Sequence, residues 1–254
     1  MIEILKNRLK QGYRTSSFPR EIPEFPERFR GRPKLRPSAC PEGCSDCLEI
    51  CPTQALEKKG SEKLSLDLGK CLFCGDCARI CPEKAIAFTL DHRMAVNSRK
   101  NLVLNEDEIN LAQALNGEIR RLFGKSLKLR QVSAGGCNAC ESELAALGNV
   151  VFDWGRFGIQ FVASPRHADG LVLTGPVTQN MAEAVLAAYH AIPDPKIIIA
   201  VGACAISGGP FRESPEQKGG AESLGFPIDL FVPGCPPHPL TILDGVLRLL
   251  GRLQ

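Results

Sequence analysis

Apolar and polar positions follow different patterns in the two halves of the chain. From residue 127 onward, short apolar runs alternate with segments of helical spacing such as 181–191 and 240–250. The runs are LKLRQVS (127–133), GLVLTGP (170–176), KIIIAVGAC (196–204) and IDLFVPGC (228–235). Ile197 to Ile199 are apolar at successive positions, as in strands that helices cover on both faces. This half therefore predicts an α/β fold, a flavodoxin-like, doubly wound parallel sheet over 127–254.

The first half predicts three further parts. Residues 1–37 form an N-terminal arm in which Ile2, Leu5 and Leu9 have helical spacing and 18–37 is a Pro-rich extended connector. Residues 38–92 hold eight cysteines and predict a small α+β domain. Residues 93–126 read as a helical linker, with a helix around 106–123. Its expected apolar face is made of Leu111, Leu115, Ile119 and Leu122.

The charged residues are informative only at the N-terminus, where basic residues are in excess. The net charge is +3, but residues 1–36 hold ten Lys and Arg against four Glu. A short amphipathic helix here suits a membrane surface or a partner, and equally a solvated tail packed on its own domain. Nucleic acid is not expected as a partner, because the basic residues are interleaved with Pro and Glu instead of aromatic residues.

The number of cysteines indicates which kind of chemistry the chain performs. The 254 residues include 12 Cys, and no signal peptide, twin-arginine leader or bilayer-length apolar run is visible. Disulfides belong mainly to secreted proteins, so we expect metal or redox chemistry at these cysteines.

Eight cysteines form an internal repeat. Cys44, Cys47, Cys51 and Pro52 recur thirty positions later as Cys74, Cys77, Cys81 and Pro82. The second copy, CLFCGDCARICP, has the bacterial ferredoxin spacing Cys-x2-Cys-x2-Cys-x3-Cys-Pro, in which closely spaced thiolates wrap a 4Fe-4S cube. The region therefore predicts a bacterial-type two-cluster ferredoxin domain.

The first copy has one extra residue between Cys40 and Cys44, which a loop can absorb. In two-cluster ferredoxins the fourth cysteine of each run serves the other cluster. We therefore expect Cys40, Cys44, Cys47 and Cys81 to hold one cluster, and Cys71, Cys74, Cys77 and Cys51 to hold the other. Two alternatives remain open, namely two four-cysteine zinc sites and loss of the first cluster through the insertion.

The remaining four cysteines are far apart in sequence but share one structural context. Cys137, Cys204 and Cys235 each follow the carboxyl end of a predicted strand, and Cys140 lies three residues after Cys137. In an open parallel sheet these ends converge on one crevice. Neighbouring glycines at 135, 136, 202 and 234 let the backbone approach a bound group closely. Four thiolates there suit a third 4Fe-4S cluster; zinc and unliganded core cysteines are the alternatives.

These motifs carry a resemblance. GGCNACESEL, RFGIQFVASPRHADGLVLTGPVTQNM, IIIAVGACAISGG and VPGCPPHPLTILDGVL resemble the small, electron-transferring subunit of membrane-bound group 4 NiFe hydrogenases and, more distantly, its counterpart in respiratory complex I. The complex I subunit usually has adjacent cysteines in place of Cys137-x-x-Cys140. GYRTSSFP, FRGRP and the two cysteine runs resemble the ferredoxin-type subunit of formate hydrogenlyase complexes, so the chain looks like two neighbouring subunits joined.

The resemblance implies that Cys137, Cys140, Cys204 and Cys235 bind the cluster nearest to a NiFe centre on a separate large subunit. This chain has no further Cys-x-x-Cys pairs free to hold nickel. It implies an iron-sulfur subunit of an oxidoreductase with three 4Fe-4S clusters and no catalytic residue of its own, peripheral on the cytoplasmic side of the membrane. Expected partners are the large subunit, membrane-embedded subunits and an electron donor such as a formate dehydrogenase or ferredoxin. Ala139, Ser142 and His238 depart from residues commoner in the family.

Other functions stay open from the residues alone. One alternative is a complex I-like subunit that works without nickel and reduces quinone, and another is a stand-alone ferredoxin with a binding module. Glu141 and Glu143 suit a helix start or a role in proton movement or partner contact. Arg166, His167 and Asp169 suit a partner interface or a solvated turn, and Asp153 and Arg156 suit a local turn pair.

Overall fold

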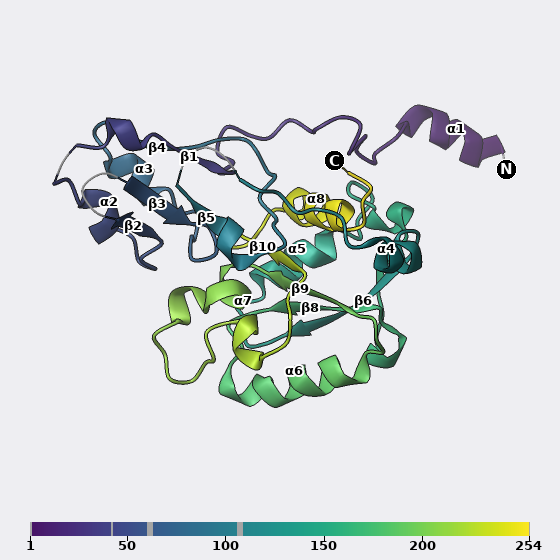
Figure 1. Cartoon of the computed structure of the whole chain (residues 1–254). Helices are drawn as coiled ribbons and strands as arrows, with labels where there is room; N and C mark the ends of the chain where they lie inside the picture. Colours follow the sequence, from purple (N-terminus) through teal and green to yellow (C-terminus); the bar gives the residue numbers. More distant parts are fainter. Residues whose placement is uncertain (1, 42, 60–62, 106–108, 254) are drawn as a thin grey trace.

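A small cysteine-rich unit lies beside a larger domain built on a parallel sheet (Figure 1). The structure is a computed structural model that describes residues 2–41, 43–59, 63–105 and 109–253. Within the described residues no helix combines the length and the apolar character needed to cross a membrane.

The larger domain has five parallel strands with the order β10-β9-β8-β6-β7. Their bounds are β6 Leu127–Ser133, β7 Ile159–Phe161, β8 Gly170–Thr174, β9 Ile197–Val201 and β10 Leu230–Val232. Numbered by their sequence within this domain, the order is 2-1-3-4-5, the flavodoxin-like order with its switch point between β6 and β8. The expected doubly wound fold is confirmed.

Helices cover both faces of this sheet, which is why β8 and β9 are buried at every position. Helix α6 (Gln179–Ala191) and the short α7 (Ala203–Ser207) share a core with Leu171, Leu173 and Ile198. On the other face, α5 (Ala139–Ala146) and α8 (Pro239–Leu249) share a core with alternate residues of the same strands, including Val172 and Ile199. Figure 1 shows α6 and α8 on opposite sides of the strands.

The four predicted strands and the two predicted helices of this domain are all present. Strand β7 was not predicted. It has only three residues with the burial pattern buried, exposed, intermediate, and it lies at the edge of the sheet. An edge strand of this length leaves too short an alternation for the sequence to indicate.

The cysteine-rich unit is built from short strands and one-turn helices. Its elements are β1 Pro33–Leu35, α2 Asp46–Glu49, β2 Leu56–Lys59, β3 Lys63–Asp67, α3 Asp76–Ile80, β4 Ile86–Phe88 and β5 Val103–Leu104. Strand β1 pairs antiparallel with β4, so residues of the arm complete this unit. Strands β2, β3 and β5 form a second antiparallel sheet.

The thirty-residue repeat of the sequence is also a repeat of geometry. Gln54 and Lys84 both have positive φ, at 49° and 50°. Directly after them, the amides of Ala55 and Ala85 donate to the sulfurs of Cys51 and Cys81, each at 3.2 Å.

The helix expected at 106–123 is wrong over most of its length. Only α4 (Gly117–Phe123) is helical; residues 109–116 have no regular structure and 106–108 lie outside the described residues. The backbone amides here go to tertiary partners, since Ala112 donates to the carbonyl of Ala95 and Leu115 to that of Leu249. Of the expected apolar face, Leu115 and Ile119 pack against the core, whereas Leu122 is 60% exposed and Phe123 is buried in its place.

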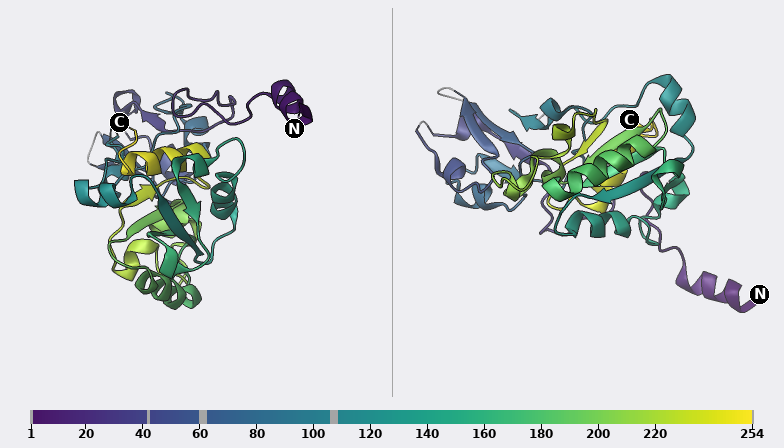
Figure 2. Two further views of the ribbon diagram at one scale, coloured as in Figure 1. Left: turned by 90° about the vertical axis from the view of Figure 1, so that its right-hand side faces the viewer. Right: turned by 90° about the horizontal axis from the view of Figure 1, so that it is seen from below.

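The arm has an isolated helix followed by an extended segment, as the proline content predicted. Helix α1 (Ile2–Gln11) stands away from the rest of the molecule in all views (Figures 1 and 2). The chain then crosses the larger domain, where Phe18 is buried, and Phe25 stacks on Phe29 with ring centroids 4.3 Å apart.

The two units share one apolar core and several polar contacts. Buried residues of the cysteine-rich unit and of one face of the large sheet form a single cluster. Ser207 of α7 donates to the carbonyl of Gly69 at 2.8 Å. A Cβ at Gly69 would lie 2.7 Å from Ile206, so this close approach requires glycine.

Short 3-10 helices complete the fold: η1 Pro37–Ala39, η2 Arg99–Leu102, η3 Trp154–Phe157, η4 Pro165–His167, η5 Gly209–Phe211 and η6 Ala221–Leu224.

Candidate functional site: three groups of four cysteines

Four cysteines lie together at the carboxyl edge of the large sheet. Cys137 follows β6, Cys140 is in the first turn of α5, Cys204 is in α7 after β9, and Cys235 follows β10. The thiol of Cys140 interacts electrostatically with those of Cys204, Cys235 and Cys137. The convergence expected from the strand ends is therefore present in the fold.

Glycines allow this convergence. Gly202 has φ +92°, and a Cβ there would lie 2.5 Å from the sulfur of Cys140. Gly209 has φ +56°, and a Cβ there would lie 2.8 Å from the sulfur of Cys204. A side chain at either position would take space beside a cysteine sulfur, so only glycine fits without a shift of that sulfur.

Burial keeps two of these thiols neutral without a bound cation. It raises the pKa of Cys204 to about 12, with the neighbouring Cys235 and Cys137 adding to the effect. Burial also raises the pKa of Cys140, with the neighbouring Cys204 and Glu141 adding to the effect. A positively charged group would be needed to hold these four sulfurs as thiolates, which is what iron supplies in a cluster.

The other eight cysteines fall into the two sets that the crossed ferredoxin pattern predicts. Cys47 interacts electrostatically with Cys40, Cys81 and Cys44, and burial is the main cause that raises its pKa. Cys71 interacts in the same way with Cys77, Cys51 and Cys74. The cysteine that ends each run thus lies with the other run.

Backbone amides point at three of these sulfurs. Besides the bonds to Cys51 and Cys81 described above, the amide of Phe73 donates to the sulfur of Cys71 at 3.3 Å. Such bonds stabilise the charge of a thiolate and help to set the potential of a bound cluster. The residues present therefore fit a cubane on chemistry and on local backbone geometry.

The spacing of the sulfurs differs from that of a single-ion site. In the described part of the chain, no three His, Cys, Asp or Glu side chains come close enough to share one metal ion. Four grouped cysteines without a single-ion site are compatible with a 4Fe-4S cluster. A cube of four irons and four sulfides keeps its thiolates at separate corners, farther apart than the ligands of one ion.

Glu141 has a structural role at the third group. Its carboxylate accepts hydrogen bonds from Ser133 at the end of β6, at 2.5 Å, and from Thr174 at the end of β8, at 2.6 Å. Burial opposes its charge, but these two hydroxyls outweigh burial, and the pKa of Glu141 is lowered. Sequence reasoning named Glu141 and missed both partners, although each hydroxyl residue stands at the end of a predicted strand.

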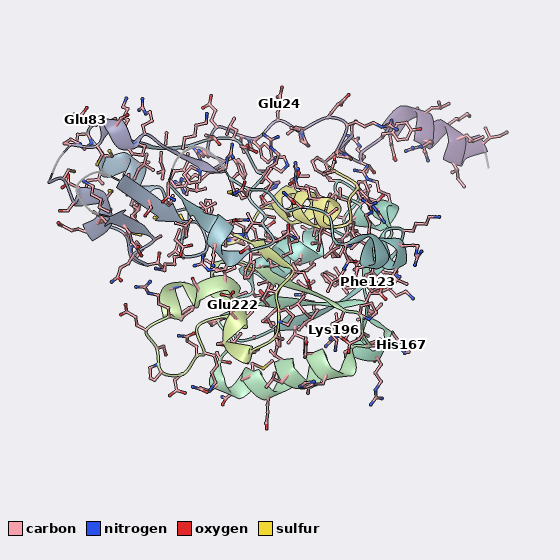
Figure 3. The ribbon with its side chains drawn as sticks, viewed as in Figure 1. Glu24, Glu83, Phe123, His167, Lys196 and Glu222 are labelled. Carbon is pink, nitrogen blue, oxygen red and sulfur yellow. The ribbon has the colours of Figure 1, made fainter. Side chains whose placement is uncertain are left out.

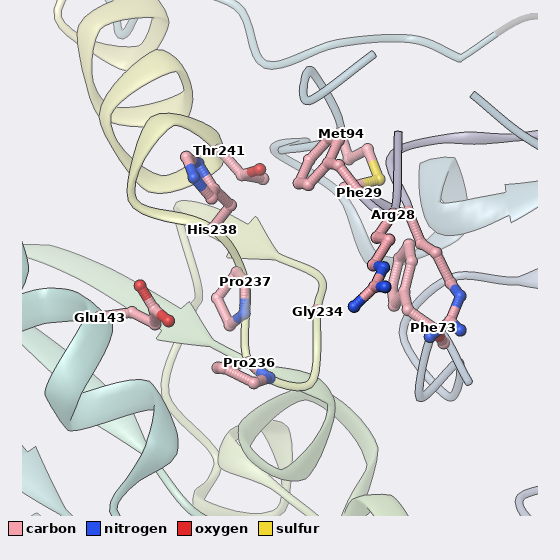
Figure 4. Close-up of a pocket in the computed structure, with 11 residues that line it drawn as sticks. Arg28, Phe29, Phe73, Met94, Glu143, Gly234, Pro236, Pro237, His238 and Thr241 are labelled. Carbon is pink, nitrogen blue, oxygen red and sulfur yellow. The ribbon is translucent and has the colours of Figure 1, made fainter. Parts of the chain in front are cut away.

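Glu143 and His238 line a cavity of about 280 Å³ between the two units (Figure 4). The opposite wall includes Phe73, which lies between Cys71 and Cys74 in sequence, and Arg28 of the arm. Burial raises the pKa of Glu143, while burial and the nearby His92 lower the pKa of His238 to about 4. His238 also caps α8, since its Nδ1 accepts from the amide of Leu240 at 3.1 Å. This departure from the family pattern is accommodated by Phe25, Phe29 and Phe152, whose rings surround the imidazole.

Two further groups of candidates lie away from the cysteines. Asp169 accepts from the amide of Lys128 at 2.7 Å, at the amino ends of the strands, and His167 lies just before β8 at the same end (Figure 3). The local turn expected for Asp153 and Arg156 is present, since the amide of Arg156 donates to the carbonyl of Asp153 at 3.1 Å. The guanidinium of Arg156 also donates to the carbonyls of Ser16 and Phe18 and holds the arm in place.

Comparison with known proteins identifies the larger domain. Residues 137–249 match the family model described as NADH ubiquinone oxidoreductase, 20 Kd subunit. The probable membrane-bound hydrogenase subunit mbhJ of Pyrococcus furiosus is 42% identical over 149 residues, which cover 59% of this chain and 89% of that protein. The chain belongs to the 20 Kd subunit family. Residues 39–85 match a second model, the 4Fe-4S dicluster domain.

Other members of the 20 Kd subunit family come from two kinds of complex. Formate hydrogenlyase subunit 7 of Escherichia coli is 42% identical over 141 residues, 56% of this chain and 55% of that protein, so the chain spans about half of its length. An NADH-quinone oxidoreductase subunit of Heliobacterium modesticaldum is 43% identical over 120 residues, 47% of this chain and 68% of that protein.

The expected family and the fusion with a ferredoxin-type domain are therefore confirmed. The chain is an iron-sulfur, electron-transfer subunit of an oxidoreductase complex of the hydrogenase or complex I type. Its 20 Kd-type domain and its dicluster domain meet where Ser207 contacts Gly69.

Proposed function

We propose that this chain carries electrons within a membrane-associated NiFe hydrogenase complex and binds three 4Fe-4S clusters. The ligand sets are Cys40, Cys44, Cys47 and Cys81 for the first, Cys71, Cys74, Cys77 and Cys51 for the second, and Cys137, Cys140, Cys204 and Cys235 for the third. The clusters, when bound, accept and release single electrons. The catalytic NiFe site, where protons and hydrogen interconvert, lies on a separate large subunit.

The serial arrangement of the three cysteine groups is the observation that carries this proposal. Cys77 of the second group interacts electrostatically with Cys47 of the first. Gly69, two residues before Cys71, accepts from Ser207, three residues after Cys204. These contacts of the second group, with the first group and with the segment that holds Cys204, support a relay of electrons through the three groups.

The role of this chain's own residues is to hold and shield these groups. Backbone amides donate to the sulfurs of Cys51, Cys71 and Cys81. Buried apolar residues limit the access of water to Cys47, Cys71 and Cys77, which belong to the core shared by the two units. Both effects tune the potential of an iron-sulfur cluster.

The two-residue spacer in Cys137-x-x-Cys140 favours the hydrogenase assignment, because the complex I subunit usually has adjacent cysteines at this place. In the structure Cys140 is the member of this pair that enters α5 and faces Cys204. The match to the Heliobacterium protein supports the alternative, a complex I-like subunit that works without nickel and reduces quinone or another acceptor.

The proposed partners are the NiFe large subunit, membrane-embedded subunits and an electron donor such as a formate dehydrogenase or ferredoxin. We place the chain at the cytoplasmic side of the membrane as a peripheral subunit. The names of the hydrogenase relatives are the support for this placement.

Isolation of the native complex tests the assignment. Iron and nickel are counted in the complex, and hydrogen evolution is measured with a reduced viologen. We expect nickel, viologen-dependent hydrogen evolution and about twelve iron atoms for this chain, from three cubes of four. Absence of nickel together with quinone reduction would establish the alternative. About eight irons in a stable monomer without a large partner would instead indicate a stand-alone ferredoxin.

A further inference from the structure

Helix α1 exposes apolar side chains that the rest of the described chain does not cover. None of its residues is buried, and Ile2, Leu5 and Leu9 are 71%, 63% and 84% exposed. The views of Figure 2 place the helix well outside the body of the molecule. A solvated tail packed on its own domain, one of the two expectations from the sequence, is therefore wrong for this segment.

The exposed side chains are arranged as a stripe. With 3.6 residues per turn, Leu5, Leu9 and Ile2 fall within an arc of roughly 60° on one side of the helix. Lys6 and Lys10 border one edge of this arc, and Arg8 borders the other. The only acidic residue of the helix, Glu3, lies beyond the lysine edge and is 3.5 Å from the ammonium of Lys6.

The helix is joined to a fixed point on the larger domain. The amide of Ser16 donates to the carbonyl of Val151 at 2.9 Å, and Arg156 donates to the carbonyls of Ser16 and Phe18. Helix α1 ends at Gln11 and Gly12 follows with φ +62°, so only a few residues separate the helix from this anchor. The molecule thus presents a short basic amphipathic helix on a short tether.

We propose that α1 lies in the surface of an anionic phospholipid bilayer, with its apolar stripe among the acyl chains. Cations on both edges of the stripe match lipid phosphates on both sides of an embedded helix, because Lys and Arg stems reach along apolar surface to the headgroups. Tyr13, 84% exposed with the guanidinium of Arg8 4.0 Å from its ring centroid, suits the same interface. A groove on a protein partner would need apolar anchors but not cations on both edges of them.

This inference goes beyond the electron-transfer role and is independent of it, since α1 contains no cysteine. It assigns to this chain its own contact with lipid, separate from any contact with membrane-embedded subunits. Ten residues of helix give modest affinity, so α1 would orient a complex held by other subunits and would not anchor the chain alone.

The full-length chain is tested by sedimentation with vesicles. One set contains equal parts of phosphatidylglycerol and phosphatidylcholine, and the other contains phosphatidylcholine alone. We expect binding to the anionic vesicles that falls with added salt, and little binding to the neutral ones. Lys6→Gln and Lys10→Gln should each weaken binding to the anionic vesicles about fivefold.

A matched pair of variants tests the stripe itself. Leu9→Gln removes an apolar side chain from the stripe and should weaken binding roughly tenfold or more. Ile4→Gln makes nearly the same change at a position that is also 71% exposed but lies on the opposite side of the helix, and should have little effect. Neither change can disturb the core, because neither residue is buried.

Three results would overturn the proposal. The first is no sedimentation with anionic vesicles, and the second is equal loss of binding in Leu9→Gln and Ile4→Gln. The third is a requirement for Leu9 in holding a membrane subunit in detergent while vesicle binding by the isolated chain does not depend on Leu9. Iron content, measured in the same samples, reports separately on the electron-transfer role.

Discussion

The dicluster unit and the parallel-sheet domain hold cysteines in opposite ways. In the dicluster unit the cysteines come from two short runs of sequence, and the surrounding strands have only two to five residues. In the sheet domain the cysteines lie far apart in sequence and are brought together by strands with a core on both faces. We therefore expect the dicluster unit to depend on its proposed clusters for folding, and the sheet domain to fold before a cluster binds.

Removal of iron should produce the largest difference between the two units, as a loss of folded structure in the dicluster unit alone. A unit of 38–92 has too small a core of its own to fold securely, and metal binding supplies part of its folding free energy. We expect amide protection to be lost across β1 to β4 and kept in β6, β8 and β9, as measured by hydrogen exchange on the apoprotein. Equal loss of protection in both units would show that the shared core makes them one cooperative body.

Each of the two cysteine runs ends in a cysteine that we assign to the cluster of the other run. Substitution of that last cysteine should therefore remove only the cluster of the other run. Cys51→Ser is expected to lose the cluster of Cys71, Cys74 and Cys77, and Cys81→Ser that of Cys40, Cys44 and Cys47. Each variant should lose about four irons per chain. Electron paramagnetic resonance of the reduced variants identifies the missing signal, and loss of the same signal from both variants would contradict the crossed assignment.

In the sheet domain, a backbone change beside the ligands should act without unfolding the chain. Gly202→Ala places a Cβ 2.5 Å from the sulfur of Cys140 and should cost the third cluster, about four irons, with the sheet intact. Gly219→Ala is the matched control, because its φ is +87° but nothing lies within 4 Å of the added carbon. Both variants carry backbone strain of about 1–3 kcal/mol, so only the difference in iron content bears on the site. Equal iron in the two variants would refute the close approach.

Loading of the third site should depend on pH. Because burial raises the pKa of Cys204 from 9.0 to about 12, the folded apoprotein binds this proton more tightly than the unfolded chain. The neutral thiol stabilises the apo fold below pH 9.0, and this contribution is lost as the pH rises toward 12. Cluster assembly must displace the proton, so its yield should increase as the pH approaches 9.0. Absorbance during anaerobic reconstitution of a variant that retains only the third set of cysteines measures this yield, and a flat pH profile would contradict the expectation.

An ion pair beside strands β3 and β5 of the cysteine-rich unit should give the smallest effect. Arg99 donates to both carboxylate oxygens of Asp67, at 2.8 and 2.6 Å, and Asp67 also accepts from the amide of Gly69. Arg99→Gln should lower the free energy of unfolding by about 1–3 kcal/mol, since it leaves a largely buried carboxylate without its cation. Arg79→Gln, which breaks an exposed pair with Asp76, should cost less than about 1 kcal/mol in the same denaturation experiment. If the two variants lose the same free energy of unfolding, the Arg99–Asp67 pair contributes no more than an exposed ion pair.

The sequence predicted most of what depends on local pattern. The four apolar runs became β6, β8, β9 and β10, and the cysteine spacing predicted the dicluster domain, whereas the crossing of its two cysteine sets stays a prediction. Strand ends in a parallel sheet also predicted that Cys137, Cys204 and Cys235 would meet, because topology fixes which ends share an edge.

What depends on tertiary contact could not be predicted. Residues 109–116 have helical spacing, but their amides are taken by Ala95, Asn97 and Leu249, and no local pattern reports such distant partners. The turn at Arg156 is present, but the acceptors of its guanidinium, at Ser16 and Phe18, could not be predicted because they are about 140 positions away. The partners of Glu141 were missed for the same reason, since Thr174 lies 33 positions along the chain.

The hydrogen bonds of Glu141 also decide what the switch point of this sheet can accept. In flavodoxin-like folds the crevice between the first and third strands is where a nucleotide cofactor docks, with its phosphate against backbone amides. Here that crevice, between β6 and β8, holds a carboxylate fixed by Ser133 and Thr174. A phosphate would meet this negative charge at the place where a flavin nucleotide otherwise binds. We therefore expect this crevice to disfavour nucleotides, although the same topology builds a nucleotide site in other flavodoxin-like folds.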